Sequence, residues 1–158
     1  MRNFFLLLLM TSGVFSLGRS QSPKQPFVIT ISPESQTVRS GSEAEITVHL
    51  KNTSDRKLDL SANISDLTGV DPNYTYEVRD SSGNLVPQRT YKHPELATGH
   101  AVFRTVQPGE SVTDSEPIGR LLDVSKPGKY VIQVSRRVSK DEKDGEVKSN
   151  KITLAVSQ

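Results

Sequence analysis

Short stretches in which apolar and polar residues alternate recur along the chain from position 27 onward. In the clearest one, four apolar residues alternate with four polar ones: Ala44, Ile46, Val48 and Leu50 with Glu43, Glu45, Thr47 and His49. A period of two is typical of a β-strand with one face buried and the other in solvent. Similar stretches cover residues 27–31, 58–64, 74–78, 130–134 and 152–156, with weaker ones at 101–106 and 111–118.

Turn-forming residues separate these stretches. Asn52 to Arg56 and the segment 80–84 (DSSGN) each predict a hairpin between the stretches on either side, and a charged tip at 139–146 predicts a third. We expect one helical turn at 121–124. Residues 88–100 show no alternation and form the longest predicted connection, of a kind that is often functional.

This spacing of strands, with no run of helical periodicity, predicts one all-β domain. About seven to nine short strands separated by turns favour an antiparallel β-sandwich. A closed β-barrel is the alternative, because the same alternation lines the inside of a barrel.

A corner motif precedes the stretch at 130–134. The segment 121–130 (LLDVSKPGKY) resembles the corner entering the penultimate strand of immunoglobulin-like (Ig-like) and fibronectin type III-like sandwiches, in which a Pro-Gly turn delivers a tyrosine. The resemblance implies structural roles for Pro127, Gly128 and Tyr130, with the tyrosine hydroxyl bonding back across the corner. Ile132 stands where antibody-type domains have a cysteine, and the chain has no tryptophan, so a close antibody-type relationship is excluded.

Residues 26–157 as a whole resemble the single Ig-like modules of uncharacterised secreted bacterial proteins. They are more faintly similar to BsuPI-type proteinase-inhibitor domains. The resemblance implies an antiparallel Ig-like β-sandwich, and because a fold of this kind supports many activities, it does not give the function.

The first twenty residues have the pattern of a secretory signal peptide. Arg2 begins a short positive start, residues 4–10 are apolar, and Gly18 and Ser20 are small residues at the expected cleavage site. We therefore expect a signal peptide at 1–20, a tether at 21–26 and the Ig-like domain at 27–158, in a secreted or periplasmic protein.

Composition removes several classes of chemistry. The chain of 158 residues has no cysteine, which excludes disulfides, thiolate metal sites and a cysteine nucleophile. Its net charge is +2, and without Arg2 and Arg19 of the leader the remaining eighteen basic and eighteen acidic residues cancel. A neutral chain without a basic stripe disfavours nucleic-acid binding, and we expect no membrane association once the leader is removed.

The remaining candidate motifs match catalytic or metal-binding patterns poorly. Ser54 to Lys57 has the SxxK spacing but lies in a predicted turn and has no partner motifs. The acidic segment 141–146 lacks the alternating order of a calcium loop. His93, Glu95 and His100 fit no zinc spacing, and His49 lies on the solvent face of its strand. We therefore expect no enzyme activity, no metal and no cofactor.

The sequence thus predicts a non-enzymatic binding module that contacts a protein or a cell-surface polymer, through a sheet edge or through loop 88–100. The candidate binding residues in that loop are Tyr91, His93, Glu95 and His100. The alternative is a proteinase inhibitor in which loop 88–100 enters the cleft of a protease. Partner identity and oligomeric state stay open.

Overall fold

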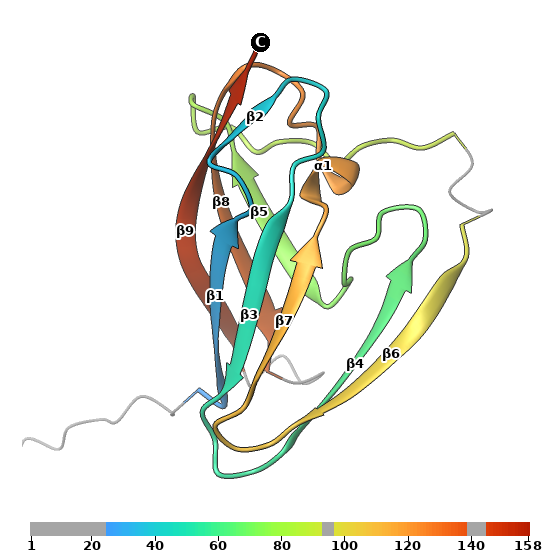
Figure 1. The fold of residues 1–158 in the computed structure, drawn as a ribbon, viewed down its shortest axis with the longest axis vertical. Helices are drawn as coiled ribbons and strands as arrows, with labels where there is room; N and C mark the ends of the chain where they lie inside the picture. The colour runs from blue at the N-terminus through green and yellow to red at the C-terminus, as the bar shows by residue number, and fades with distance from the viewer. Residues whose placement is uncertain (1–24, 93–96, 139–144) are drawn as a thin grey trace, which may run out of the picture.

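The computed structural model describes residues 25–92, 97–138 and 145–158, so the predicted signal peptide lies outside the described residues. The described part of the chain forms nine strands and one helical turn (Figure 1). They are β1 (Phe27–Pro33), β2 (Thr37–Arg39), β3 (Ile46–Asn52), β4 (Leu58–Ser65), β5 (Tyr74–Arg79), β6 (Gly99–Val106), β7 (Ser111–Glu116), α1 (Ile118–Leu121), β8 (Gly128–Arg137) and β9 (Glu146–Ser157). No helix among these residues is long and apolar enough to cross a membrane.

The strands form two facing sheets and a separate two-stranded ribbon. One sheet has the order β1-β3-β7, the other β2-β9-β8-β5, and the ribbon pairs β4 with β6. Every pairing is antiparallel except that of β2 with β9. Immunoglobulin-type sandwiches place strands A, B and E in one sheet and strands C, F and G in the other. In chain order, β1, β3 and β7 correspond to A, B and E, and β5, β8 and β9 correspond to C, F and G. This arrangement confirms the predicted Ig-like β-sandwich.

The core lies between the two sheets and consists of the apolar residues that the alternation places inward. Ile46, Val48 and Leu50 of β3 are fully buried, and Ile132 and Leu154 face them from the other sheet. Burying an aliphatic side chain of this size contributes about 1.5 to 3 kcal/mol. The sandwich therefore holds together through the alternation that the sequence displays.

The corner before β8 has the geometry that the resemblance implies. The Tyr130 hydroxyl donates a hydrogen bond to the carbonyl of Lys126 at 2.7 Å, while the tyrosine ring is buried. Gly128 has φ of 154°, a backbone conformation that residues with a side chain rarely adopt. Pro127 and Gly128 therefore deliver the chain into β8 with the tyrosine turned inward.

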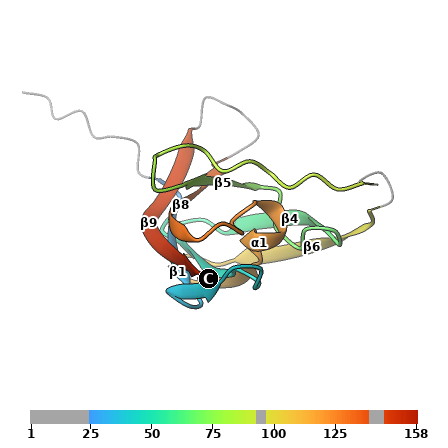
Figure 2. The same ribbon diagram turned by 90° about the horizontal axis from the view of Figure 1, so that it is seen from above.

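The helical turn begins at Ile118, three residues before the predicted 121–124. Tertiary packing decides its position, since Ile118 is fully buried and the Gly119 N–H donates to the carbonyl of Ala44 at 3.0 Å. A Cβ atom at Gly119 would lie 2.9 Å from the Ala44 nitrogen, so only glycine fits there without a shift. Seen from above, α1 lies at one end of the sandwich, between the sheets (Figure 2).

Two predicted connections differ from the structure. The predicted hairpin of β3 with β4 is wrong: β4 follows β3 after a tight turn but pairs with β6, because β3 already lies between β1 and β7. The predicted loop 88–100 is shorter than expected, since Gly99 and His100 begin β6. Its first residues are held to the body, where the Arg89 N–H donates to the carbonyl of Leu121 at 2.8 Å.

Candidate binding cleft

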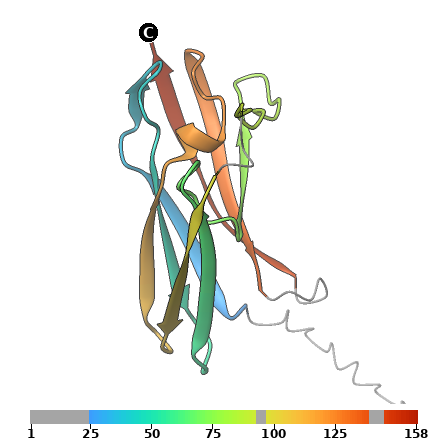
Figure 3. The same ribbon diagram turned by 90° about the vertical axis from the view of Figure 1, so that its right-hand side faces the viewer.

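A cleft of about 340 Å³ lies between β7 and the β4–β6 ribbon. The ribbon starts close to β7 at one end of the molecule and diverges from it toward the other (Figure 1). From the side, β4 and β6 lie across the opening between the two sheets (Figure 3). β7 is the last strand of its sheet, and its outer edge pairs with no other strand in the described residues. A free strand edge therefore borders the cleft.

One wall of the cleft is aliphatic and comes from the inner face of the ribbon. Alternation along β4 and β6 places residues of the same parity on this face, and Ala62 and Val102 are opposite each other in the register. All the aliphatic residues of this wall are half-buried: Leu60, Ala62, Ile64 and Val102. The volume lies at the lower end of the range of ligand sites, and the remaining lining adds charged and polar side chains to this aliphatic wall.

The opposite side of the cleft contains a buried ion pair. Nη1 of Arg136 lies 2.9 Å from Oδ2 of Asp71, and each side chain is only 9% exposed. The guanidinium also lies 4.9 Å from the centre of the Tyr74 ring, which adds a cation–π contact. Oδ1 of Asp71 accepts two hydrogen bonds from Asn73. Both charges of this pair are therefore satisfied inside the protein.

Glu116 lies beside that pair at the end of β7 and is 2% exposed. Its Oε2 accepts hydrogen bonds from the Asp71 N–H at 3.0 Å and from the Tyr76 hydroxyl at 2.8 Å. Burial raises the pKa of Glu116 to about 7, against the opposing effect of these two hydrogen bonds. Burial also raises the pKa of Tyr76, so its hydroxyl stays protonated and keeps donating.

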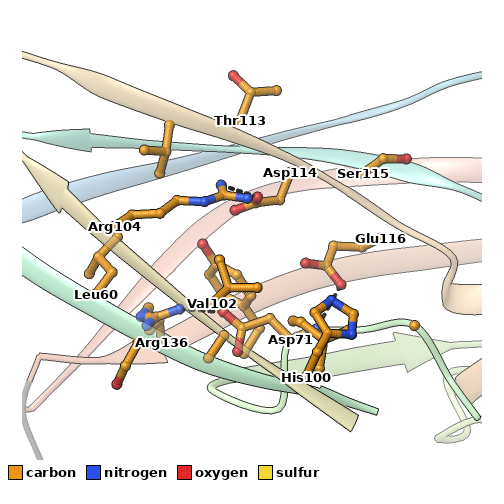
Figure 4. Close-up of a pocket in the computed structure, with 16 residues that line it drawn as sticks. Leu60, Asp71, His100, Val102, Arg104, Thr113, Asp114, Ser115, Glu116 and Arg136 are labelled. Atoms are coloured by element: carbon orange, nitrogen blue, oxygen red, sulfur yellow. Dashed lines mark hydrogen bonds and ion pairs between the residues drawn. The ribbon is translucent and has the colours of Figure 1, made fainter. Parts of the chain in front are cut away.

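One ion pair ties the ribbon to the sandwich, and a second group of side chains joins the two strands of the ribbon to each other. Arg104 of β6 forms an ion pair with Asp114 of β7 (Figure 4). At the open end, Asp66 accepts a hydrogen bond from the Thr98 hydroxyl, and its Oδ1 lies 3.3 Å from Nδ1 of His100. These contacts hold the pKa of Asp66 below its usual value, with the bond from Thr98 as the main cause. An exposed ion pair such as that of Arg104 with Asp114 contributes about 0 to 1 kcal/mol, so this link between the ribbon and β7 can open at low cost.

The structure separates the predicted binding residues. His100 lines the cleft from β6, whereas Tyr91 lines a different hollow with Arg120, to whose carbonyl its hydroxyl donates. His93 and Glu95 lie outside the described residues. The binding role of these four residues stays a prediction, and they do not form one site in the described part of the chain.

Three residues of the cleft were not predicted from the sequence: Asp71, Glu116 and Arg136. Arg136 follows Tyr130, Ile132 and Val134 in the same alternating phase, and it is buried as they are. Glu116 is the last residue of β7, a strand with little alternation of apolar and polar residues. Its inward positions become more polar along the strand, from Val112 to Asp114 to Glu116. A charged residue in the inward phase of a strand was the available signal, since such a residue needs a buried partner.

The chain is only weakly similar to known proteins. No family model matches the chain, and no curated protein matches it in sequence. Among solved structures, the chain is similar to a β-glucosidase from Listeria innocua (TM-score 0.43, 14% identity, 82% of this chain and 16% of that chain). It is also similar to a CARDB domain from Pyrococcus furiosus (0.38, 18%, 83% and 94%) and a β-glucosidase from Erythrobacter marinus (0.41, 18%, 82% and 15%). The chain thus spans about a sixth of the length of these glucosidases.

Proposed function

We propose that the protein is a non-enzymatic binding module that holds an extended segment of a partner protein between β7 and the β4–β6 ribbon. The observation that carries the proposal is the unpaired edge of β7, which lines the cleft with consecutive residues from Val112 to Glu116. An unpaired edge offers backbone N–H and C=O groups to an added strand, which is a recurring mode of peptide recognition.

The lining of the cleft favours a protein segment over a cell-surface polysaccharide. Sugar sites commonly use exposed aromatic faces, and the only aromatic residue lining the cleft in the described part of the chain is Tyr74, whose face is covered by Arg136. The exposed Phe103 belongs to the outer face of the ribbon, opposite Ser61 in the register. An aliphatic wall beside a strand edge instead suits alternate side chains of an extended peptide.

Loop 88–100 is less suited to the alternative role in a proteinase inhibitor. Gln88 bridges to Leu122, and the Arg89 N–H is bonded to the carbonyl of Leu121. Tyr91 bonds to the carbonyl of Arg120. An inhibitory loop has to present its backbone to a protease, whereas these residues are engaged with their own domain. We therefore assign binding to the cleft and keep the inhibitor as the competing hypothesis.

We also propose that the protein acts outside the cytoplasm. The resemblance to Ig-like modules of secreted bacterial proteins and the leader pattern support a protein that is exported, cleaved near Ser20, and meets its partner outside the cytoplasm. Sequencing the N-terminus of exported protein tests this part, and recovery of an uncleaved chain starting at Met1 would contradict it.

A selection from a display library of linear twelve-residue peptides tests the cleft directly. Ala62→Trp fills the cleft from the inner face of the ribbon, and Ala101→Trp adds the same bulk on the outer face, where Ala101 is exposed. We expect peptides that bind the natural chain to lose at least tenfold in affinity with Ala62→Trp and to keep it with Ala101→Trp. Failure to recover any peptide with this dependence would overturn the proposal.

A further inference from the structure

Glu116 differs from the other charged residues that line the cleft because it has no cationic partner within the described ranges. Asp71 is paired with Arg136, and Asp114 is paired with Arg104. No lysine, arginine or histidine forms an ion pair with Glu116 in the described residues, and both of its hydrogen bonds end on Oε2. Its second oxygen, Oε1, accepts no hydrogen bond there, and the side chain lines the cleft.

We propose that the partner segment inserts a lysine or arginine side chain into the cleft, where its cationic group pairs with Glu116. The inference rests on the proposed function, since it describes what the same cleft recognises. The aliphatic wall formed by Leu60, Ala62 and Val102 packs against the methylene stem of such a side chain. Beyond the stem, a hydrogen bond to a charged carboxylate is stronger than one between neutral groups.

An anionic ligand does not fit this arrangement. The only buried cation on the cleft wall in the described residues, Arg136, is already occupied by Asp71 and by the Tyr74 ring. An anion placed next to Glu116 would face the carboxylates of Asp71 and Asp114 as well. A neutral side chain would leave Glu116 unpaired, and so it gains none of the attraction that a cation gains.

The affinity for such a cation has to depend on pH, because a proton competes for the same carboxylate. With a pKa of about 7, Glu116 is about one-tenth ionised at pH 6 and about nine-tenths ionised at pH 8. Binding is therefore about tenfold tighter at pH 8 than at pH 6, at equal peptide charge. The groups that face Glu116 or line the same cleft are Asp71, Tyr74, Tyr76, His100, Arg104, Asp114 and Arg136.

Because several ionisable groups line the cleft, the pH profile needs a variant that isolates Glu116. Glu116→Gln is that variant. Glutamine keeps the size of the side chain and an oxygen that accepts from Tyr76 and Asp71, while it removes the charge. Any pH dependence that remains in Glu116→Gln then belongs to other groups, and the difference between the two proteins belongs to Glu116.

The experiment uses the peptides whose binding is lost in Ala62→Trp. We expect them to share a lysine or arginine, and replacement of that residue by acetyl-lysine or citrulline to weaken binding at least tenfold at pH 8. In Glu116→Gln the charged and neutral peptides should bind within about threefold of each other. If Glu116→Gln fails to fold, as judged by its urea denaturation, the tenfold pH effect is measured in His100→Asn instead, so that His100 cannot account for it.

The outcomes distinguish this inference from the proposed function. Cleft-dependent peptides that lack lysine and arginine, or that bind equally well as citrulline and acetyl-lysine forms, would overturn the inference and leave the binding cleft standing. The absence of any cleft-dependent peptide would overturn both. Equal loss for charged and neutral peptides in Glu116→Gln would also contradict a charge-specific role.

Discussion

β3 and β4 follow one another along the chain and show the same alternation, yet they lie in different surroundings. Ile46, Val48 and Leu50 of β3 are completely buried, whereas the corresponding aliphatic residues of β4 are only half-buried. β3 lies between two strands and beneath the second sheet, while β6 is the one strand that pairs with β4 in the part of the chain that the structure describes. Alternation therefore reports which face of a strand points inward, and it does not report whether another layer covers that face.

The same contrast explains where the polar residues lie. Between the two sheets the core is apolar, but at the side covered by the ribbon the protein buries the charged residues Asp71, Glu116 and Arg136. Buried charges cost free energy unless they are paired, so a fold seldom places them where apolar packing would suffice. Their position beside an incompletely filled cleft is what suggests a site for recognition.

The largest effect should come from breaking the buried ion pair. Arg136→Met retains an aliphatic stem but leaves the Asp71 carboxylate buried without its partner, which should lower the free energy of unfolding by about 3 to 5 kcal/mol. Arg104→Met is the matched control: its pair with Asp114 is 42% and 23% exposed, so a loss of at most about 1 kcal/mol is expected. Urea denaturation of both variants measures the difference, and equal losses would contradict the contrast between the two regions.

Truncating one leucine in each region tests the contrast in packing. Leu50→Ala leaves a cavity in the sandwich core, where the side chain is 0% exposed, and should cost about 2 to 5 kcal/mol. Leu60→Ala removes the same atoms from the half-buried wall of the cleft and should cost about 1 kcal/mol or less. Thermal and urea melts of the pair are the measurement. A larger loss for Leu60 would mean that the ribbon belongs to the core.

Glu116 should make stability depend on pH in a direction opposite to that of most carboxylates. Its pKa rises from 4.5 to about 7 on folding, so the folded chain holds the proton more tightly. The stabilising contribution is complete below about pH 4.5 and is lost as the pH rises to about 7, by ~1.4 kcal/mol for each pH unit between these two values. Urea denaturation at pH 5 and pH 8 measures it, and Glu116→Gln should remove this part of the dependence. A profile that is identical in both proteins would show that Glu116 titrates normally.

The Tyr130 corner offers a contrast to Glu116, because it lies away from the cleft and its hydrogen bond joins a neutral hydroxyl to a backbone carbonyl. Tyr130→Phe leaves the carbonyl of Lys126 without this donor, and we expect a loss of roughly 1 to 3 kcal/mol. The denaturation midpoint measures the loss, compared with that of Tyr91→Phe, whose hydroxyl also donates to a backbone carbonyl but in an exposed hydrogen bond. An unchanged midpoint would mean that the corner does not stabilise the domain.

The sequence predicted the sandwich because its strands satisfy a local rule. The alternation in β1, β3, β5, β8 and β9 and the corner before β8 each depend on residues close together in the chain. Pairing is decided by distant residues, so the partner of β4 and the start of β6 could not be read from the same pattern. The helical turn begins at Ile118 and not at the predicted residue 121 for the same reason, since the Gly119 N–H donates to the carbonyl of the distant residue Ala44.

The candidate cleft could be predicted only in part. His100 was selected from the sequence and lines the cleft, but its neighbours there come from β4, β7 and β8, which are distant in the chain. Arg136 and Glu116 continue the inward phase of their strands, which indicates burial without naming the partner. A pair such as Asp71 and Arg136, 65 positions apart, becomes visible only when the sheets are assembled.

The smallest expected effect concerns the outer face of the ribbon. Phe103 is 78% exposed, so it buries little surface in the folded chain, and Phe103→Ser should change the free energy of unfolding by no more than about 0.5 kcal/mol. Because Phe103 points away from the cleft, cleft-dependent peptides should keep their affinity within about twofold. Urea denaturation and peptide titration measure the two quantities. A loss of stability above about 1 kcal/mol would mean that the outer face of the ribbon is packed in solution, and a loss of peptide binding would move the recognition surface from the cleft to that face.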